Sequence, residues 1–307
     1  MELVRGLHSL SRRHAACVLT VGNYDGVHLG HQHMIGRLRE RAAEVGCPAA
    51  VLVFEPSSKE FIDPEGAPPR LTRWREKYVA LRGLEIDTLV TLNFDEAMRA
   101  MSPERFVGEL LVARLQVRHL VVGDDFRYGC RAYGTIDTLT AAGREHGFTV
   151  EQLAPFVADG VRVSSTAVRS RLATGDFGGA ARLLGRPYRM WGRVAHGEKL
   201  GRTLGFPTAN LALARRRSPV QGILAVRVHG AGPHPMPGVA SLGTRPTVNG
   251  RQLKLEVHLF DFAGDLYGRA LEVEFVRKLR DEVKFDSLAA LTEQMNLDAR
   301  AAREALS

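Results

Sequence analysis

Cysteine is scarce in this chain. Only Cys17, Cys47 and Cys130 occur among 307 residues, and no two of them stand in a C-x-x-C spacing. An odd number of isolated cysteines argues against a disulfide framework, and these three lack the paired spacing of a structural zinc site. We therefore interpret them as small packing residues.

Long hydrophobic runs are also missing. A membrane-spanning helix needs about 20 apolar residues, and no run of that length occurs. The N-terminal stretch MELVRGLHSLSRRHAA lacks the apolar core of a signal peptide. The sequence predicts neither a membrane span nor secretion, and the cytoplasm is the expected location.

Aromatic residues are few, at 7% of the chain, although the net charge is +8. The positive charge is nearly all arginine and is spread along the chain, with one short cluster at 215–217. Nucleic-acid-binding proteins more often carry a dense basic stripe with interleaved aromatics. The composition therefore favours small phosphorylated ligands over nucleic acid, and nothing in it indicates an oligomeric state.

The length is comfortable for two domains. From residue 15 to about 153, short apolar runs alternate with helical periodicity, which predicts an α/β domain with a parallel sheet. From residue 187 the pattern changes to short alternating strands separated by Gly and Pro, which predicts a small β-barrel or sandwich followed by a helix at about 287–305. We place the boundary near 186 and expect the two halves to fold independently.

The stretch GNYDGVHLGHQ joins the first predicted strand to the first long helix. Two histidines three residues apart at a helix start can bind an anion, because the unpaired N–H groups and the helix dipole favour negative charge. A metal pair and ordinary helix capping are the alternatives, but neither explains so many glycines. The candidate phosphate-binding residues are Gly22, Asn23, Asp25, Gly26, His28, Gly30 and His31.

Two further segments of the first half carry polar residues. The loop VVGDDFRYGCRAYG follows the fourth predicted strand and contains Asp125, a candidate nucleotide-binding residue. The segment SSTAVR places hydroxyl groups at a predicted helix start and an arginine about one turn later, which could hold a phosphate from two sides. Its candidate residues are Ser164, Ser165, Thr166 and Arg169.

The segment HGEKLGRTLGFPTAN opens the second half. It lacks the Gly-Lys-Ser/Thr sequence of a P-loop, but its glycines could still bring backbone amides to phosphates. Thr208 and Asn210 offer neutral oxygens that suit Mg²⁺, while a plain β-turn is the alternative. The candidate glycines are Gly197, Gly201 and Gly205.

The predicted strand KLEVHLFDF places Glu256 and His258 on one face, because side chains alternate along a strand. A carboxylate beside a histidine can act as a general base. It can equally be a solvated surface residue, and the pattern leaves both interpretations open.

Six motifs in this order resemble the bacterial bifunctional riboflavin kinase/FAD synthetase family over nearly the whole chain. They are GNYDGVHLGH, VVGDDFRYG, SSTAVR, GFPTAN, LGTRPTV and LEVHLFDF followed by DLYG. The resemblance implies a Rossmann-like nucleotidyltransferase domain over 1–186, which transfers AMP from ATP to FMN. It also implies a riboflavin kinase domain over 187–307, a six-stranded antiparallel barrel with a terminal helix. The chain departs from the family pattern at Tyr24, Ser57 and Leu224.

The resemblance also implies roles for individual residues. His28 and His31 match the histidines that hold the ATP phosphates, with Asn23 and Asp25 beside them, and SSTAVR matches a second phosphate-binding motif. In the barrel, Thr208 and Asn210 match residues that bind Mg-ATP, and Glu256 matches the base for the riboflavin 5′-hydroxyl. The alternatives are a protein in which only one half is active, more plausibly the kinase, and a non-catalytic flavin- or nucleic-acid-binding regulator.

Overall fold

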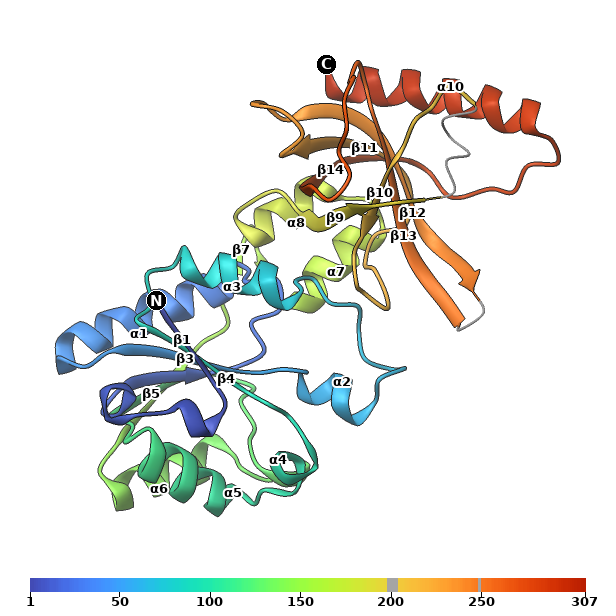
Figure 1. The fold of residues 1–307 in the computed structure, drawn as a ribbon. Helices are drawn as coiled ribbons and strands as arrows, with labels where there is room; N and C mark the ends of the chain where they lie inside the picture. Colours follow the sequence, from blue (N-terminus) through green and yellow to red (C-terminus); the bar gives the residue numbers. More distant parts are fainter. Residues whose placement is uncertain (198–203, 248–249) are drawn as a thin grey trace. The chain divides into compact units, whose positions relative to one another are not determined.

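A computed structural model describes residues 1–197, 204–247 and 250–307 (Figure 1). The chain forms two compact units. The first contains Met1–Pro68 and Lys77–Val163, and the second contains Pro69–Glu76 and Ser164–Ser307. Each unit is described separately below.

The first unit is built on a six-stranded sheet in which every neighbouring pair is parallel. All four residues of β2 are buried, as expected for a strand covered on both faces. The first strand, β1, was not predicted, because it is a short edge strand of mixed polarity. In spatial order the strands are β1 (Glu2–Arg5), β4 (Thr88–Leu92), β3 (Ala49–Phe54), β2 (Val18–Val21), β5 (His119–Gly123) and β6 (Thr149–Leu153).

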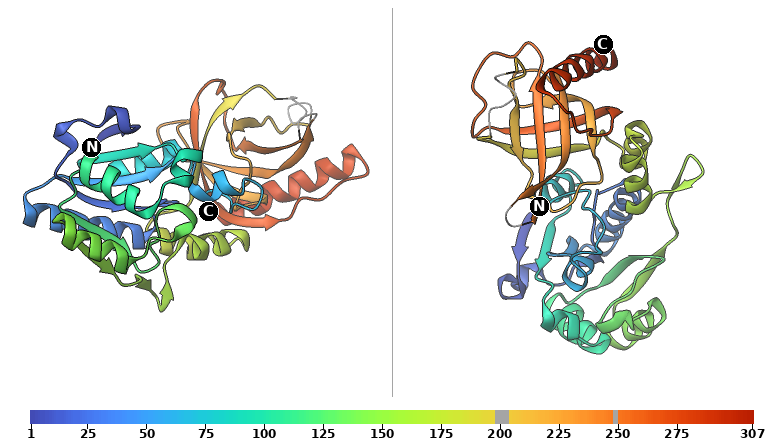
Figure 2. Two further views of the ribbon diagram at one scale, coloured as in Figure 1. Left: turned by 90° about the horizontal axis from the view of Figure 1, so that it is seen from below. Right: turned by 90° about the vertical axis from the view of Figure 1, so that its right-hand side faces the viewer.

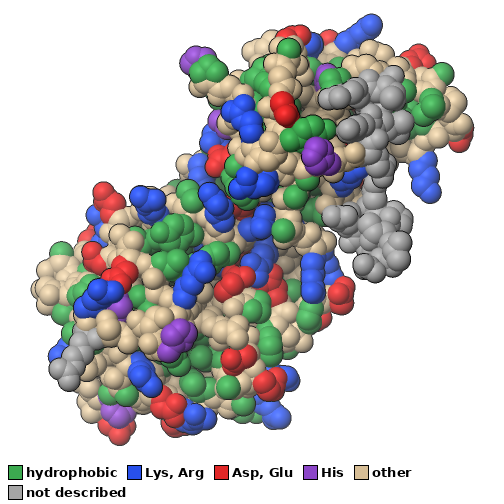
Figure 3. All heavy atoms as spheres, viewed as in Figure 1, with side chains coloured by type: hydrophobic (Ala, Val, Ile, Leu, Met, Phe, Trp, Pro, Cys, Tyr) green, Lys and Arg blue, Asp and Glu red, His purple; other side chains and the backbone are tan. Residues whose placement is uncertain are grey.

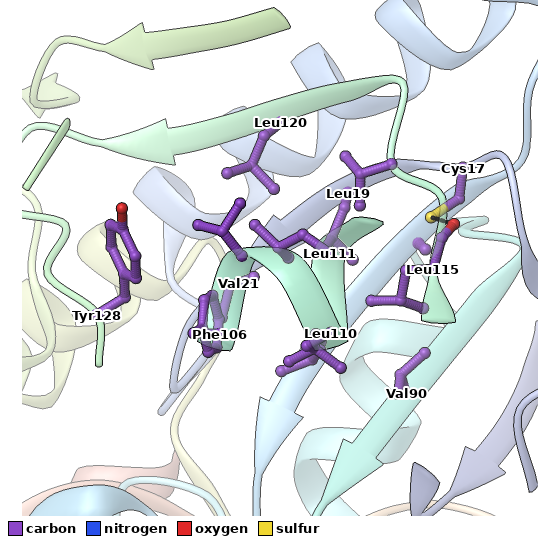
Figure 4. Close-up of a cluster of buried hydrophobic side chains, with 14 of the residues drawn as sticks. Cys17, Leu19, Val21, Val90, Phe106, Leu110, Leu111, Leu115, Leu120 and Tyr128 are labelled. Carbon is purple, nitrogen blue, oxygen red and sulfur yellow. Dashed lines mark hydrogen bonds between the residues drawn. The ribbon is translucent and has the colours of Figure 1, made fainter. Parts of the chain in front are cut away.

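Helices cover both faces of this sheet, as predicted for an α/β domain, with α1 (Leu29–Val45) on one side and α6 (Ile136–His146) on the other (Figure 1). Within the region of predicted helical periodicity, the segment 102–115 is α-helical only at α5 (Pro103–Arg105) and continues as a π-helix, η3 (Phe106–Arg114). Its leucines pack against the sheet together with Leu19 and Leu120 (Figure 4). Shorter elements are α2 (Ser58–Ile62), α3 (Trp74–Arg82), α4 (Glu96–Ala100), β7 (Val157–Ala158) and β8 (Val161–Arg162).

The second unit contains a closed six-stranded antiparallel barrel, preceded by α7 (Ser165–Ala173) and α8 (Phe177–Leu184). The terminal helix, α10 (Leu288–Leu306), lies along the outside of the barrel (Figure 2). The short strand β10 had not been recognised as a separate element in the sequence. Around the barrel the strands are β10 (Ala209–Ala212), β13 (Gly250–Leu259), β12 (Met236–Thr247), β11 (Gly222–His229), β14 (Ala270–Arg280) and β9 (Arg189–Ala195).

The segment Pro69–Glu76 packs within the second unit. The guanidinium of Arg215, whose side chain is 1% exposed, forms an ion pair with Glu76. Glu76 also accepts a hydrogen bond of 2.9 Å from the backbone N–H of Trp191, and the Tyr188 hydroxyl donates to the Leu71 carbonyl at 3.0 Å. The compact units therefore do not coincide with a cut at residue 186.

Lys and Arg side chains are scattered among acidic and hydrophobic ones on the face shown in Figure 3. No helix among the described residues is long and apolar enough to cross a bilayer.

Candidate active sites

The first candidate site lies where β2 leads into α1. His28 is the N-cap of α1, and its Nδ1 accepts a hydrogen bond of 3.3 Å from the backbone N–H of His31. A neutral imidazole that accepts at Nδ1 carries its proton on Nε2. The rings of His28 and His31 stack with centroids 3.6 Å apart and an interplanar angle of 15°. The two imidazoles thus form one unit at the positive end of the helix dipole.

The backbone of this turn is strained. Tyr24 has φ of 48° and Val27 has φ of 43°, and both side chains are buried. A β-branched residue such as Val27 rarely adopts positive φ, and such strain concentrates at functional sites. A methyl group on Gly30 would lie only 3.3 Å from the His28 ring and 3.4 Å from the carbonyl oxygen of Val163. The glycine therefore allows the helix start to approach the residue directly before SSTAVR.

Burial lowers the pKa of His31 well below its usual value, and the neighbouring His28 and Lys77 lower it further. His31 is therefore neutral at physiological pH. Its Nδ1 is buried and has no hydrogen-bond partner within the described parts of the chain. The residue Lys77, in the first turn of α3, is only 4% exposed. Lys77 was missed in the sequence, because an isolated lysine in a charged helix gives no local signal of burial.

The other predicted residues of the first unit lie at the same edge of the sheet. Since β2 and β5 are neighbouring parallel strands, the loops after them are adjacent. Asp125, in the loop after β5, and Asn23 are exposed, whereas Asp25 is partly buried. The neighbouring Asp124 forms an ion pair of 2.9 Å with Arg162.

The SSTAVR motif lies in the second compact unit. Ser164 is the N-cap of α7, and its hydroxyl accepts a hydrogen bond of 3.1 Å from the Ala167 N–H. Ser165 is partly buried and Thr166 is exposed. Arg169 donates through Nε to the Pro69 carbonyl at 2.7 Å. This arginine therefore connects α7 to the segment Pro69–Glu76, whether or not it also binds a ligand.

The second candidate site is a pocket of about 570 Å³ on the barrel. Asn210 on β10 lies directly opposite Glu256 on β13 in the strand ladder. Thr208, Asn210, Glu256 and His258 all line the pocket. The structure therefore brings the GFPTAN and LEVHLFDF motifs together in one cavity.

Asn210 is placed to bind a cation or a nucleotide. Its Oδ1 is buried and accepts no hydrogen bond from the described residues. A methyl group on Gly197 would collide with the Asn210 carboxamide, so the glycine allows that side chain to lie close to the backbone. Gly205 adopts φ of 82° in the turn before β10, while Gly201 lies outside the described residues.

The oxygens of Asn210 and Thr208 fit the preference of Mg²⁺ for hard ligands. No group of three or more His, Cys, Asp or Glu side chains suited to a metal occurs in the part of the chain that is described. A magnesium ion here would therefore share its coordination with substrate phosphates and water, as is usual for this ion.

Glu256 has a cation beside it. The ammonium of Lys254 lies 2.7 Å from the Glu256 carboxylate, and their side chains are 25% and 22% exposed. Across the ladder, Ser241 lies opposite Glu256 and donates its hydroxyl to Glu282 at 3.0 Å. Lys254 was missed as a site residue, although its position two residues before Glu256 on the same strand face was a usable signal.

The pocket has both polar and apolar lining residues. Among the polar ones, Arg280 at the end of β14 donates two hydrogen bonds of 2.8 and 2.7 Å to the buried Asp298 carboxylate of α10. A cavity with apolar and polar parts can bind a flat ring system that carries a polar chain. The apolar lining includes Ile223, Val239, Leu288, Leu291 and Met295.

Comparisons with known proteins match both halves of the chain. Residues 10–167 match the FAD synthetase family model, and residues 184–306 match the riboflavin kinase model. The chain is 52% identical over 304 residues to a bifunctional riboflavin kinase/FMN adenylyltransferase of Pseudomonas fluorescens, covering 99% of this chain and 97% of the relative. It is 47% identical over 305 residues to the protein of the same description from Escherichia coli K12, with coverage of 99% and 97%.

A crystal structure described as a macrolide-efflux protein from Streptococcus pneumoniae also matches. Its TM-score is 0.82 at 27% identity, and the match covers 99% of each chain. The arrangement of elements described above therefore also occurs in a solved structure of the same length.

Proposed function

Because the chain belongs to the family of bifunctional riboflavin kinase/FMN adenylyltransferases, we propose that it phosphorylates riboflavin to FMN and adenylylates FMN to FAD, with ATP as the donor in both reactions. The observation that carries the proposal is that each matched domain contains a formed site. The histidine pair lies at the helix start of the first, and the Asn210–Glu256 pair lies in the pocket of the second.

In the kinase reaction, the riboflavin 5′-hydroxyl attacks the γ-phosphorus of ATP, and ADP leaves. Glu256 accepts the hydroxyl proton, because an alcohol is a weak nucleophile until it loses that proton. Thr208 and Asn210 would hold Mg²⁺ together with the ATP phosphates, where the ion would offset the charge of the phosphoryl group. The apolar part of the pocket holds the flavin ring, so that the ribityl chain reaches Glu256.

In the adenylylation, a phosphate oxygen of FMN attacks the α-phosphorus of ATP, and pyrophosphate leaves. The nucleophile is already an anion, so this site needs no general base. His28 donates through Nε2–H to the phosphate oxygens, and the N-terminus of α1 stabilises the charge that builds on pyrophosphate. The remaining proposed nucleotide contacts are Asn23, Asp25, Asp125, Ser164, Ser165, Thr166 and Arg169.

We assign the adenylyltransferase to residues 1–186 and the kinase to 187–307, with ATP, riboflavin and FMN as small-molecule partners. The cytoplasmic location stays a prediction. Neither nucleic acid nor a membrane enters the proposed reactions.

The test is to incubate the purified chain with riboflavin and Mg-ATP and to separate the flavins by chromatography. Formation of FMN and then FAD is expected, and EDTA should stop both steps. FMN alone would mean that only the kinase half is active. Neither product, even when FMN is supplied, would favour a flavin-binding regulator instead.

A further inference from the structure

His258 lines the kinase pocket but has no part in the proposed reaction. It lies two residues after Glu256 on β13, and both side chains reach the same cavity. The sequence placed this histidine beside a carboxylate without giving it a role. Its contacts in the structure connect it to the proposed nucleotide loop, of which residues 206–208 lead into β10.

The His258 ring is fixed by one hydrogen bond and two aromatic contacts. Nδ1 lies 2.9 Å from the carbonyl oxygen of Pro207. A carbonyl oxygen can only accept, so Nδ1 carries the hydrogen and donates it. The ring also meets Phe206 and Phe260 edge to face, with centroids 5.1 and 5.8 Å apart.

This hydrogen bond acts where the strand ladder ends. The pairing of β10 with β13 begins at Ala209, so residues 206–208 lie outside it. Pro207 has no N–H to contribute to a ladder, which leaves its carbonyl as its only backbone hydrogen-bonding group. The His258 side chain donates a hydrogen bond to that carbonyl. It therefore connects β13 to the residues before β10, where the backbone pairing of the two strands has ended.

Resting on the proposed kinase function, we infer that His258 is a positioning residue for Mg-ATP. By holding Pro207, it fixes Thr208, the next residue, which lines the pocket. Glu256 and His258, on the same strand, then have different roles. Glu256 faces the riboflavin hydroxyl to be phosphorylated, and His258 fixes the loop that binds ATP.

Two variants separate the hydrogen bond from the ring. His258→Phe keeps an aromatic ring and removes the donor, whereas His258→Asn keeps an N–H donor at nearly the position of Nδ1 and removes the ring. Loss of one hydrogen bond typically costs about 2- to 10-fold in an equilibrium. We expect His258→Phe to raise the KM for Mg-ATP by that factor with kcat nearly unchanged, and His258→Asn to restore the parental KM.

Thermal unfolding of both variants, followed alongside the kinetics, reports any general loss of stability. The inference is overturned if His258→Phe lowers kcat without changing the KM for Mg-ATP, if both variants lose activity equally, or if His258→Phe behaves like the parent. Titration calorimetry with Mg-ATP gives an independent readout. If the parental chain makes no FMN, the proposed function fails, and the Kd of Mg-ATP in the same variants still decides whether His258 positions the nucleotide loop.

Discussion

At the scale of single residues, the burial of His31 makes stability depend on pH. Its pKa is lowered in the folded chain, so the unfolded chain binds the proton more tightly. As the pH falls below about 6.5, the free energy of unfolding should decrease by up to about 1.4 kcal/mol per pH unit. Above that pH the contribution is constant.

Urea denaturation between pH 5 and pH 8 measures this effect against a His31→Asn variant. Burial also lowers the pKa of His119, so only the difference between the parent and the variant isolates His31. Parallel pH profiles for the two proteins would contradict the assignment of a buried neutral imidazole.

Removing both imidazoles should separate the two activities. His28→Ala with His31→Ala deletes the donors at the α1 start, and loss of one such donor typically costs about 10²- to 10³-fold in kcat. The double variant should convert riboflavin to FMN but make little FAD. If it remains folded and loses both activities, the assignment of two separate sites is wrong.

Glu256→Gln is the complementary substitution. It keeps the shape of the side chain and removes the base, which typically costs about 10²- to 10⁴-fold in rate. The variant should fail to phosphorylate riboflavin yet adenylylate supplied FMN, as flavin chromatography would show. Normal FMN production would mean that the carboxylate is only a solvated strand residue.

At the scale of elements, glycines at close approaches should differ from glycines in open helices. Gly197→Ala places a methyl group against the Asn210 carboxamide, whereas a methyl group on Gly36, inside α1, meets nothing within 4 Å. We expect Gly197→Ala to lower kinase activity. Gly36→Ala should raise the free energy of unfolding by about 0.5 to 1 kcal/mol and leave the kinase unchanged.

Kinase rates and urea denaturation of both variants check this prediction. Full kinase activity in Gly197→Ala would show that the position of Asn210 seen here is not needed for Mg-ATP. A destabilised Gly36→Ala would show that α1 is less regular than described.

Elements with long apolar runs were predictable from the sequence, and those without were not. The buried runs of β2 and β3 give a strong signal. The hydroxyl residues Ser164, Ser165 and Thr166 indicated a helix start without deciding among them, and Ser164 is the N-cap of α7. β1 and β10 mix polar and apolar residues over only four positions, so they form neither an apolar run nor a visible period. Lys77 reaches the first site through tertiary packing, which leaves no trace in its local sequence.

At the scale of the whole molecule, the division into two compact units affects the stability of fragments made by cutting the chain. A fragment of residues 187–307 keeps Arg215 but loses Glu76, its buried ion-pair partner. Removing one partner of a buried pair typically costs about 3 to 5 kcal/mol, because the other charge remains buried. We therefore expect this fragment to be less stable than its own Arg215→Met variant.

Urea denaturation of the two fragments measures the difference, and Glu76→Gln in the full chain serves as the matched control. Equal stability of the fragment and its Arg215→Met variant would show that Glu76 is dispensable. The cut near 186 would then be supported as a folding boundary.

The closure of the barrel has a consequence for self-association. Each barrel strand pairs with a neighbour on both sides, so the barrel presents no unpaired strand to another chain. The sheet of the first unit ends instead at β1 and β6, whose outer backbone groups could recruit an added strand. On β6, Glu151 forms ion pairs with Arg37 and Arg41 of α1. The other edge strand, β1, has only four residues. Short and charged edges of this kind discourage strand addition. Any aggregation that proceeds by strand addition should therefore begin with fraying of β1.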